Sequence, residues 1–552
     1  MVYTGKPSRG CQTCKSRRIK CDEARPTCTQ CRKSGRTCPG YPDEFDLIFR
    51  NENVALERRA RKASGSKSAS QGSSRPSPSS SSEPGLESSV IFFPDSPGSQ
   101  YSPETVHQNL ILPSDNSLFQ AYVWYLGNAV PPALTPSAEA QATAFFFRNF
   151  VLLPQQAESM RGFLELLVPL YNKASASSAL HLATHAVSLS ALGNYPGRQK
   201  LLQDASVSYG QALRKVNLAL KDPVESKSDE TVLAILMFSL YEAIVSTNET
   251  VSAWANHVDG AVALTKVRGA EQFKNPQSYQ VFRAVRTMMV TSCVQRSKPV
   301  EDFPGSHGWM GDEHGEENAA NRLTLISIDL PNLRARARTL LSYQKSASTE
   351  AGALDLISYA QMVDTNLENW VCTLPPSWSF RTARMVYEMP VDLENAEQWP
   401  GPQHVYDDVY IANIINDYRV SRIFCQSVVL GCASWLAPEG NDPRTDSACV
   451  TARSVIQQMV DEISASVPFH MSYDMQPMAK ELGQDESAAE AVGGYFLVWP
   501  LFVAANAETV PKPQRDWLHG RLYHIGREFG LNSAQILVLA RRHVLTCGPR
   551  FP

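Results

Sequence analysis

Six of the twelve cysteines lie near the amino terminus with a repeated spacing. A constant shift of 17 positions relates the first three to the second three, which are Cys11, Cys14 and Cys21, then Cys28, Cys31 and Cys38. Two equivalent arms of three cysteines predict a small structure with approximate twofold symmetry. So short a segment has too little apolar surface to hold itself together, so we expect the cysteines to supply the cross-links.

Closely spaced cysteines can bind metal or form disulfides. A structural zinc ion takes four thiolate or imidazole ligands in a tetrahedron, and no histidine precedes His107. Six thiolates can serve one ion with two left over, or two ions if two thiolates bridge. The repeat favours two ions, because each arm then gives its leading cysteine to both. Three disulfides would need an oxidising compartment, which the lack of a recognisable secretory signal and the scattered other cysteines argue against.

Basic residues fill the gap between the second and third cysteines. This insert, Lys15–Lys20, is long enough for about one and a half helical turns. We expect Arg17 and Arg18 at its exposed end and Ile19 packed inward. An arginine can bind guanine O6 and N7 through two hydrogen bonds in the major groove. Gly35 stands in the second arm where the first has Arg18, so we expect that arm to be less organised and to contact phosphates.

The cysteine spacing and the basic first arm resemble the six-cysteine binuclear zinc cluster of fungal gal-type transcription activators. The resemblance implies two zinc ions bound by Cys11, Cys14, Cys21, Cys28, Cys31 and Cys38. It implies that Cys11 and Cys28 bridge the ions, and that the two cysteines following each of them complete one site. It also implies that Arg18, with Arg17 beside it, reads a CGG-like triplet.

Charge is divided unevenly along the chain. The whole chain has a net charge of −3, from 52 Lys and Arg against 55 Asp and Glu. Residues 1–42 hold ten basic and two acidic residues, a net +8, so the remainder carries −11. Six thiolates and two zinc ions would bring the segment to about +6. A basic head on an acidic body is typical of nucleic-acid binding. We expect phosphate contacts from Lys15, Lys20, Arg32 and Lys33.

Two segments separate this head from the rest. Residues 43–63 fit a short basic helix. Leu47 and Val54 are one heptad apart, but the next heptad position is Arg61, so the apolar pattern is too short for a coiled coil. Its basic end fits nuclear import, phosphate binding or a solvated helix face. Residues 64–115 form a linker, since positions 64–103 hold 16 Ser and 6 Pro and cannot bury enough apolar surface to order.

From residue 116 to 552, apolar residues recur with the 3.6-residue period of helices. We therefore predict a mainly α protein: a small zinc cluster, a disordered linker and a large all-α regulatory domain. Residues 231–246 are apolar on nearly every face, which predicts a buried central helix. Further helices are predicted over 179–193, 200–221, 252–268, 277–296, 351–371, 446–465 and 515–528.

Three motifs in this region resemble the helical regulatory domain that accompanies many fungal zinc clusters. They are the segment 254–269, which begins Trp254-x-x-His257 and ends at Gly269, the segment 466–470, and Trp499-Pro500-Leu501. They occur in the order expected behind a zinc cluster. Gly269 is expected to end its helix.

The large region shows no catalytic pattern. His181 and His185 have a spacing that can bind metal, but no Glu lies between them and no third ligand is apparent, so we expect a packed or surface pair. The acidic stretch 312–317 is expected to be a solvated loop. We expect most of the other cysteines to be buried small side chains: Cys293, Cys372, Cys425, Cys432, Cys449 and Cys547.

The resemblance thus implies a nuclear, sequence-specific DNA-binding regulator, an activator of RNA polymerase II genes, with the genes of one pathway or of secondary metabolism as its implied targets. Expected partners are double-stranded DNA and transcriptional coregulators, with a homodimer and a small-molecule effector as options. No stretch reaches the ~18–20 apolar residues of a membrane span. Two other classes stay open: a zinc-dependent protein-interaction scaffold, which usually has wider spacing and histidine ligands, and an enzyme with a zinc-binding appendage.

Overall fold

The structure is a computed structural model of the 552-residue chain. It describes residues 13–14, 17, 19–22, 28–36 and 38 of the amino-terminal segment, and residues 136–539 apart from 196, 248–252, 306, 312–316, 439–441, 443–444 and 472–489. The predicted basic helix (43–63) and linker (64–115) lie outside the described residues. So do Cys11, Lys15 and Arg18. The amino-terminal segment contains helix α2 (Thr29–Lys33), and the helical body is a separate part of the chain.

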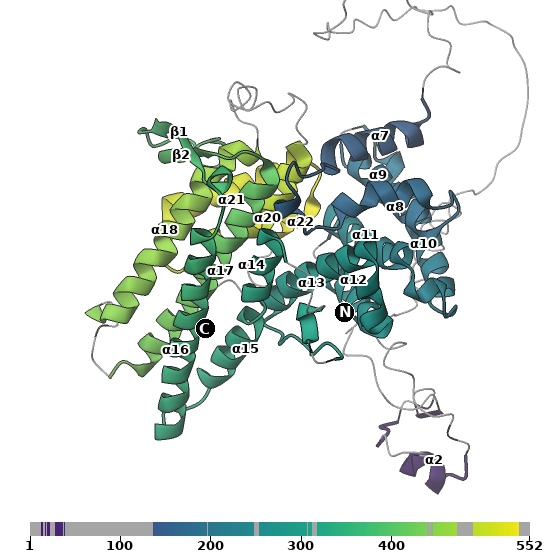
Figure 1. The fold of residues 1–552 in the computed structure, drawn as a ribbon, viewed down its shortest axis with the longest axis horizontal. Coiled ribbons are helices and arrows are strands. Elements are labelled where there is room, and N and C mark those ends of the chain that lie inside the picture. Colours follow the sequence, from purple (N-terminus) through teal and green to yellow (C-terminus); the bar gives the residue numbers. More distant parts are fainter. Residues whose placement is uncertain are drawn as a thin grey trace, which may run out of the picture. The chain divides into compact units, whose positions relative to one another are not determined.

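In its described residues the body consists of helices joined mostly by short turns, with one small hairpin (Figure 1). Its first half runs through α7 (Ala138–Phe150), η2 (Ala157–Ser159), η3 (Leu164–Leu166), α8 (Leu167–Lys173), α9 (Ala179–Gly193), α10 (Lys200–Ala219), η4 (Glu225–Lys227), α11 (Asp229–Val245), α12 (Ala253–Arg268), η5 (Gly269–Lys274) and α13 (Pro276–Arg296). Its second half runs through η6 (Gly308–Met310), α14 (Ala319–Ser327), α15 (Leu330–Leu340), α16 (Ala347–Cys372), η7 (Pro376–Trp378), β1 (Arg381–Val386), β2 (Gly401–Val405), α17 (Val409–Leu436), α18 (Ser447–His470), α20 (Glu490–Ala505), α21 (Lys512–Glu528) and α22 (Asn532–Leu539).

Polar side chains fix where the main helices begin. The hydroxyl of Ser178 accepts a hydrogen bond from the His181 N–H at 3.2 Å and starts α9. The hydroxyl of Ser228 caps α11 in the same way, and the carboxylate of Asp408 caps α17. Each cap satisfies an N–H group that the first helical turn leaves without a partner.

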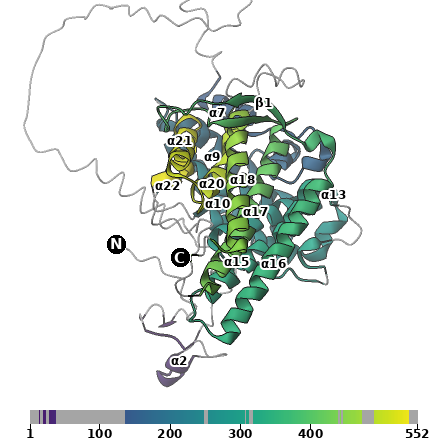
Figure 2. The ribbon, with the colours of Figure 1, turned by 90° about the vertical axis from the view of Figure 1, so that its left-hand side faces the viewer.

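Two largely buried helices form the centres of the two halves. Helix α11 is buried on almost every face and packs against α9, α12, α10 and α13. Helix α17 lies between α16 and α18 and also contacts α20, as both views show (Figures 1 and 2). The predicted buried helix over 231–246 is confirmed. The two centres are held together through contacts of α13 with α14 and α15, and of α11 with α22.

The helices predicted from periodicity are confirmed. Helix α9 spans the predicted residues 179–193, and the other predicted ranges correspond to α10, α12, α13, α16, α18 and α21. Gly269 has φ +61°, in the left-handed region, and ends α12 as expected. No helix in the described part of the body is both long and apolar enough to cross a membrane.

One element departs from the predicted all-helical body. Strands β1 and β2 pair antiparallel, with Arg381 opposite Val405 and Val386 opposite Gly401, and the register shifts between Thr382 and Arg384. Strand β2 packs on α18. The hairpin is a small addition to a mainly α fold.

Glu317 corrects the expectation of a solvated acidic loop. Its carboxylate is only 10% exposed and lies 2.8 Å from Arg283 Nε and 2.9 Å from Arg286 Nη1. The Arg286 side chain is fully buried, and a buried charge needs a paired counter-charge. Residues 312–316 lie outside the described residues. For Glu317, the prediction of a solvated position is wrong.

The histidine pair and most of the body's cysteines are packed, as expected. His181 Nε2 lies 3.0 Å from the Tyr171 carbonyl oxygen, and His185 Nδ1 lies 3.2 Å from the Ser208 hydroxyl, so the imidazoles have different partners. Four of the cysteines are buried, which raises the pKa of each thiol, and Cys372 is exposed: the four are Cys293, Cys425, Cys432 and Cys449. Cys547 lies outside the described residues.

Candidate metal centre and nucleic-acid contacts

Helix α2 gives the second cysteine arm its shape. Cys28 is the N-cap, and its Sγ accepts a hydrogen bond from the Cys31 N–H at 3.3 Å. At the other end, the Gly35 N–H donates to the Arg32 carbonyl and the Arg36 N–H to the Cys31 carbonyl, which is a Schellman motif. Gly35 has φ +63°, where glycine is favoured. The expectation that Gly35 makes this arm less organised is wrong, because Gly35 ends the helix in a defined geometry.

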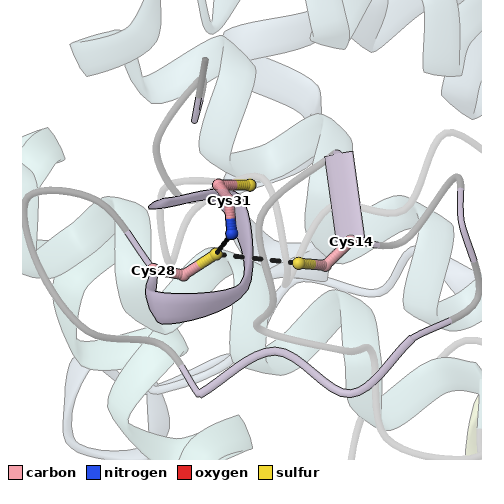
Figure 3. A group of neighbouring side chains, drawn as sticks. All are labelled: Cys14, Cys28 and Cys31. Carbon is pink, nitrogen blue, oxygen red and sulfur yellow. Dashed lines mark hydrogen bonds between the residues drawn. The ribbon is translucent and has the colours of Figure 1, made fainter. Parts of the chain in front are cut away.

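Three thiols of the segment meet in a buried group (Figure 3). Cys14 Sγ and Cys28 Sγ lie 3.7 Å apart. Together with Cys31 Sγ they all lie within 4.8 Å of one another, and each residue is at most 1% exposed. A disulfide would need about 2.05 Å between sulfurs. Two thiolates on one tetrahedral zinc lie about 3.8 Å apart, given Zn–S bonds of about 2.3 Å. The sulfur spacing therefore fits zinc ligation.

Cys28 also belongs to a second possible metal-binding group. This group joins Cys28 to Cys21 and to the carboxylate of Asp22, with all ligand atoms within 4.8 Å. Cys28 Sγ is thus the ligand atom that the two groups share. Cys38 is partly buried and packs against the first group.

Asp22, which from the sequence counts only as a negative charge, makes a structural contact in this segment. Its carboxylate accepts a hydrogen bond from the Thr29 N–H, at 3.0 Å to Oδ1 and 3.3 Å to Oδ2. These hydrogen bonds lower the pKa of Asp22. The contact ties the end of the first arm to the start of α2. The sequence does show an acidic residue next to Cys21. Nothing in the sequence indicates that its hydrogen-bond partner is Thr29, seven positions later.

The first arm differs from its predicted form at Ile19. Thr13 and Cys14 are helical, and the Ile19 N–H donates to the Cys14 carbonyl at 3.1 Å. The Ile19 side chain nevertheless keeps 39% of its surface exposed. The prediction that it packs inward is wrong, because the buried group of this segment consists of cysteines.

The described basic side chains of the segment are exposed to solvent: Arg17, Lys20, Arg32, Lys33 and Arg36. Arg32 and Lys33 occupy the last turn of α2. Exposed cations beside a cross-linked centre are available to neutralise phosphates. Lys15 and Arg18 lie outside the described residues.

Two family models match the chain, one in each part. Residues 9–46 match the fungal Zn(2)-Cys(6) binuclear cluster domain, and residues 143–295 match the fungal specific transcription factor domain. The chain thus contains both domains that characterise the fungal zinc-cluster transcription factors. The second match runs from within α7 to the end of α13, which is the first half of the body.

Similar proteins carry corresponding descriptions. The transcription factor dbaG of Emericella nidulans is 23% identical over 432 residues, covering 75% of this chain and 94% of that protein. White-opaque regulator 2 of Candida albicans is 52% identical over 44 residues, 8% of this chain and 10% of that protein. The aspercryptin biosynthesis cluster-specific transcription regulator atnN of Emericella nidulans is 54% identical over 37 residues, 7% of this chain and 6% of that protein. No solved structure matches the chain.

Family membership assigns the amino-terminal segment to zinc and DNA binding in the regulation of transcription. It places the chain among transcription factors rather than enzymes. The segment contributes soft thiolate ligands, which suit zinc, and exposed cations, which suit a nucleic acid. The resemblance drawn from the cysteine spacing and from the motif 254–269 is therefore confirmed, and the motifs 466–470 and 499–501 lie outside the matched ranges.

Proposed function

We propose that this transcription factor binds two zinc ions through six thiolates and reads a CGG-like triplet in double-stranded DNA. The proposed ligands are Cys11, Cys14, Cys21, Cys28, Cys31 and Cys38, with Cys11 and Cys28 bridging. Arg17 and Arg18 read bases, and Lys15, Lys20, Arg32 and Lys33 contact phosphates. In this proposal it acts in the nucleus as an activator of RNA polymerase II genes, within a single pathway or secondary metabolism.

The observation that carries this proposal is that cysteines from both arms of the repeat, Cys14, Cys21 and Cys31, place their thiols around that of Cys28. A single four-thiolate site would leave two of the six cysteines without a role. Two tetrahedral sites made from six thiolates need two shared ligands. By the seventeen-residue repeat, the counterpart of Cys28 in the first arm is Cys11.

The domain organisation and partners belong to the same proposal. Residues 1–42 form the DNA-binding cluster, 43–63 a basic connection, 64–115 a linker and 116–552 the regulatory domain. Coregulators, a second copy of the chain and a small-molecule effector are its proposed partners through the helical body. The similarity to atnN, over 37 residues and 7% of this chain, supports a role in a biosynthetic pathway.

The zinc content of the purified full chain tests the cluster directly. We expect two zinc ions per chain by elemental analysis, because all six thiolates are then used. One ion per chain would contradict the binuclear arrangement. One ion together with no DNA binding would favour a zinc-dependent interaction scaffold.

Two arginine variants separate base reading from phosphate contact. In the full chain, Arg18→Ala should relax preference at one base pair by about 1–3 kcal/mol, roughly fivefold to 150-fold. The matched variant Arg32→Ala should weaken binding equally on all sequences and reduce the salt dependence by about one phosphate contact. Binding-site selection and titrations at several salt concentrations measure both effects. A uniform loss for Arg18→Ala would show that Arg18 contacts only phosphate.

A further inference from the structure

A cavity of about 240 Å³ lies where the two halves of the helical body meet. Its wall is formed by helices α11, α12 and α13 of the first half and by α17, α20 and α22 of the second, together with residues 161–165. Residues from positions 161 to 537 thus converge on one space. A ligand held here would contact both halves at once.

Two tryptophans from the sequence motifs line this cavity. Trp254 belongs to the motif 254–269 on α12, and Trp499 to Trp499-Pro500-Leu501 on α20. Both side chains are only partly buried in a region where most large apolar side chains are fully buried. Neither motif lies in the zinc cluster, so DNA recognition by the cluster does not account for them.

Aromatic rings make up much of the remaining wall. Tyr410 and Phe496 contribute an edge-to-face pair with centroids 5.3 Å apart, and Phe163 and Tyr495 lie beside them. Aromatic walls favour flat aromatic ligands, which stack on faces or contact edges. An apolar cavity of about 150 Å³ can hold benzene, so this cavity has room for one or two fused rings.

The charged groups of the wall already have partners. Arg161 pairs with Asp417. Arg296 holds Asp259 through two hydrogen bonds of 2.8 and 2.6 Å. An anionic ligand would therefore have to displace a carboxylate from its guanidinium, or remain in the cavity as an unpaired charge. Both are costly, because a buried charge needs a counter-charge.

One carboxyl group and two side-chain amides contribute polar atoms to the wall. The Glu165 carboxyl is almost fully buried and accepts hydrogen bonds from the N–H groups of Arg161 and Gly162. Burial raises the pKa of Glu165 to about 7, which favours its uncharged form. The amides of Gln295 and Asn413 also line the cavity and can both donate and accept. These groups suit a hydroxyl or carbonyl on an otherwise apolar ligand.

We propose that this cavity binds an uncharged aromatic compound of one or two rings that carries a hydroxyl or carbonyl group. Its role as the effector of a transcription factor rests on the proposed function; its binding to the body does not. Occupation would bridge α11, α12 and α13 to α17, α20 and α22, so the ligand stabilises the contact between the halves.

The test uses 2-naphthol as the probe and the full, zinc-loaded chain. We expect saturable binding, measured by quenching of tryptophan fluorescence and by a rise in the melting temperature of the body. Ala243 lines the cavity from α11, and Ala243→Phe should fill the space and weaken binding at least about tenfold. The control Ala351→Phe adds the same ring at an exposed position of α16 and should bind 2-naphthol like the unchanged chain.

A second variant keeps the test valid if Ala243→Phe does not fold. Asn413→Leu should weaken 2-naphthol about tenfold, the value of one lost hydrogen bond, while leaving naphthalene binding unchanged. The anion 2-naphthoate should bind the unchanged chain at least about tenfold more weakly than 2-naphthol.

Two results would overturn the proposal: no saturable binding of 2-naphthol, or tighter binding of 2-naphthoate. DNA binding is measured on the same samples in parallel. If 2-naphthol does not bind while zinc-dependent DNA binding persists, only the cavity proposal fails. If 2-naphthol binds while DNA binding is absent, the result counts against the proposed function instead.

Discussion

Burial raises the pKa of the Glu165 carboxyl to about 7, from an ordinary value of 4.5. The N–H groups of Gly162 and Arg161 and the Arg161 charge oppose this shift, and the Asp408 charge adds to it. Tyr410 also lies near this carboxyl. Between pH 4.5 and pH 7 the folded chain therefore keeps a proton that the unfolded chain has released. Stability must then fall as pH rises through that window, because the folded state binds more protons.

Glu165→Gln tests this assignment through the pH dependence of stability. The amide oxygen can accept the same N–H hydrogen bonds without ionising. We expect the variant to be more stable than the unchanged chain at pH 8, by at most about 3 kcal/mol, and to lose that advantage near pH 4.5. Urea unfolding of both proteins from pH 4.5 to 8 measures the difference. A difference that does not change with pH would show that Glu165 titrates normally in the folded state.

At the scale of elements, two helices approach closely at a glycine. A Cβ on Gly493 of α20 would lie 2.1 Å from the carbonyl oxygen of His470, the last residue of α18. Such a distance is far inside van der Waals contact, and the obstacle is backbone rather than a flexible side chain. The crossing of α18 and α20 therefore depends on the missing side chain.

Gly493→Ala should destabilise the body by about 1–3 kcal/mol, because the helices must separate to admit the methyl group. Gly210→Ala is a matched control within α10, where a Cβ meets nothing within 4 Å. There the change should stabilise by about 0.5–1 kcal/mol, since alanine loses less conformational entropy in a helix. Thermal unfolding followed by circular dichroism compares the two variants. Equal effects would mean that the α18–α20 crossing tolerates a side chain.

The helices could be predicted from sequence because their signals are local. Apolar residues with a 3.6-residue period and an N-terminal cap such as Ser178 lie within a few positions of the helix they specify. The hairpin was missed because β1 ends at Val386 and β2 begins only at Gly401, a connection far longer than the two- to five-residue turn by which a hairpin is recognised in a sequence.

The remaining differences arise from partners far away in the sequence. Glu317 was expected in solvent, but it is held by Arg283 and Arg286, about thirty positions before it. The cavity needs Trp254 and Trp499 together, and their separate motifs carry no information that they converge. In the cluster, the cysteine repeat predicted the ligand types, whereas the contact of Asp22 with Thr29 depends on the folded connection between the arms.

At the scale of the molecule, each described part has its own buried centre. The core of the body is built from residues between Ala142 and Ala534. The amino-terminal segment buries Cys14, Cys28 and Cys31 in a cluster of their own. Among the described residues of the segment this core consists of three small side chains, which are too few to offset the conformational entropy of ordering the chain around them. Metal ligation must supply the difference, so folding of the segment is coupled to zinc binding.

Removal of zinc should therefore affect the two parts differently. In excess EDTA we expect the full chain to lose specific DNA binding, while the melting temperature of its helical body changes by less than about 2 °C. All the proposed ligands lie between Cys11 and Cys38, and the body's core contains none of them. Gel-shift assays and circular dichroism at 222 nm on one sample follow both properties, and added zinc should restore binding. A fall of many degrees in the melting temperature would instead show that the metal centre supports the body's fold.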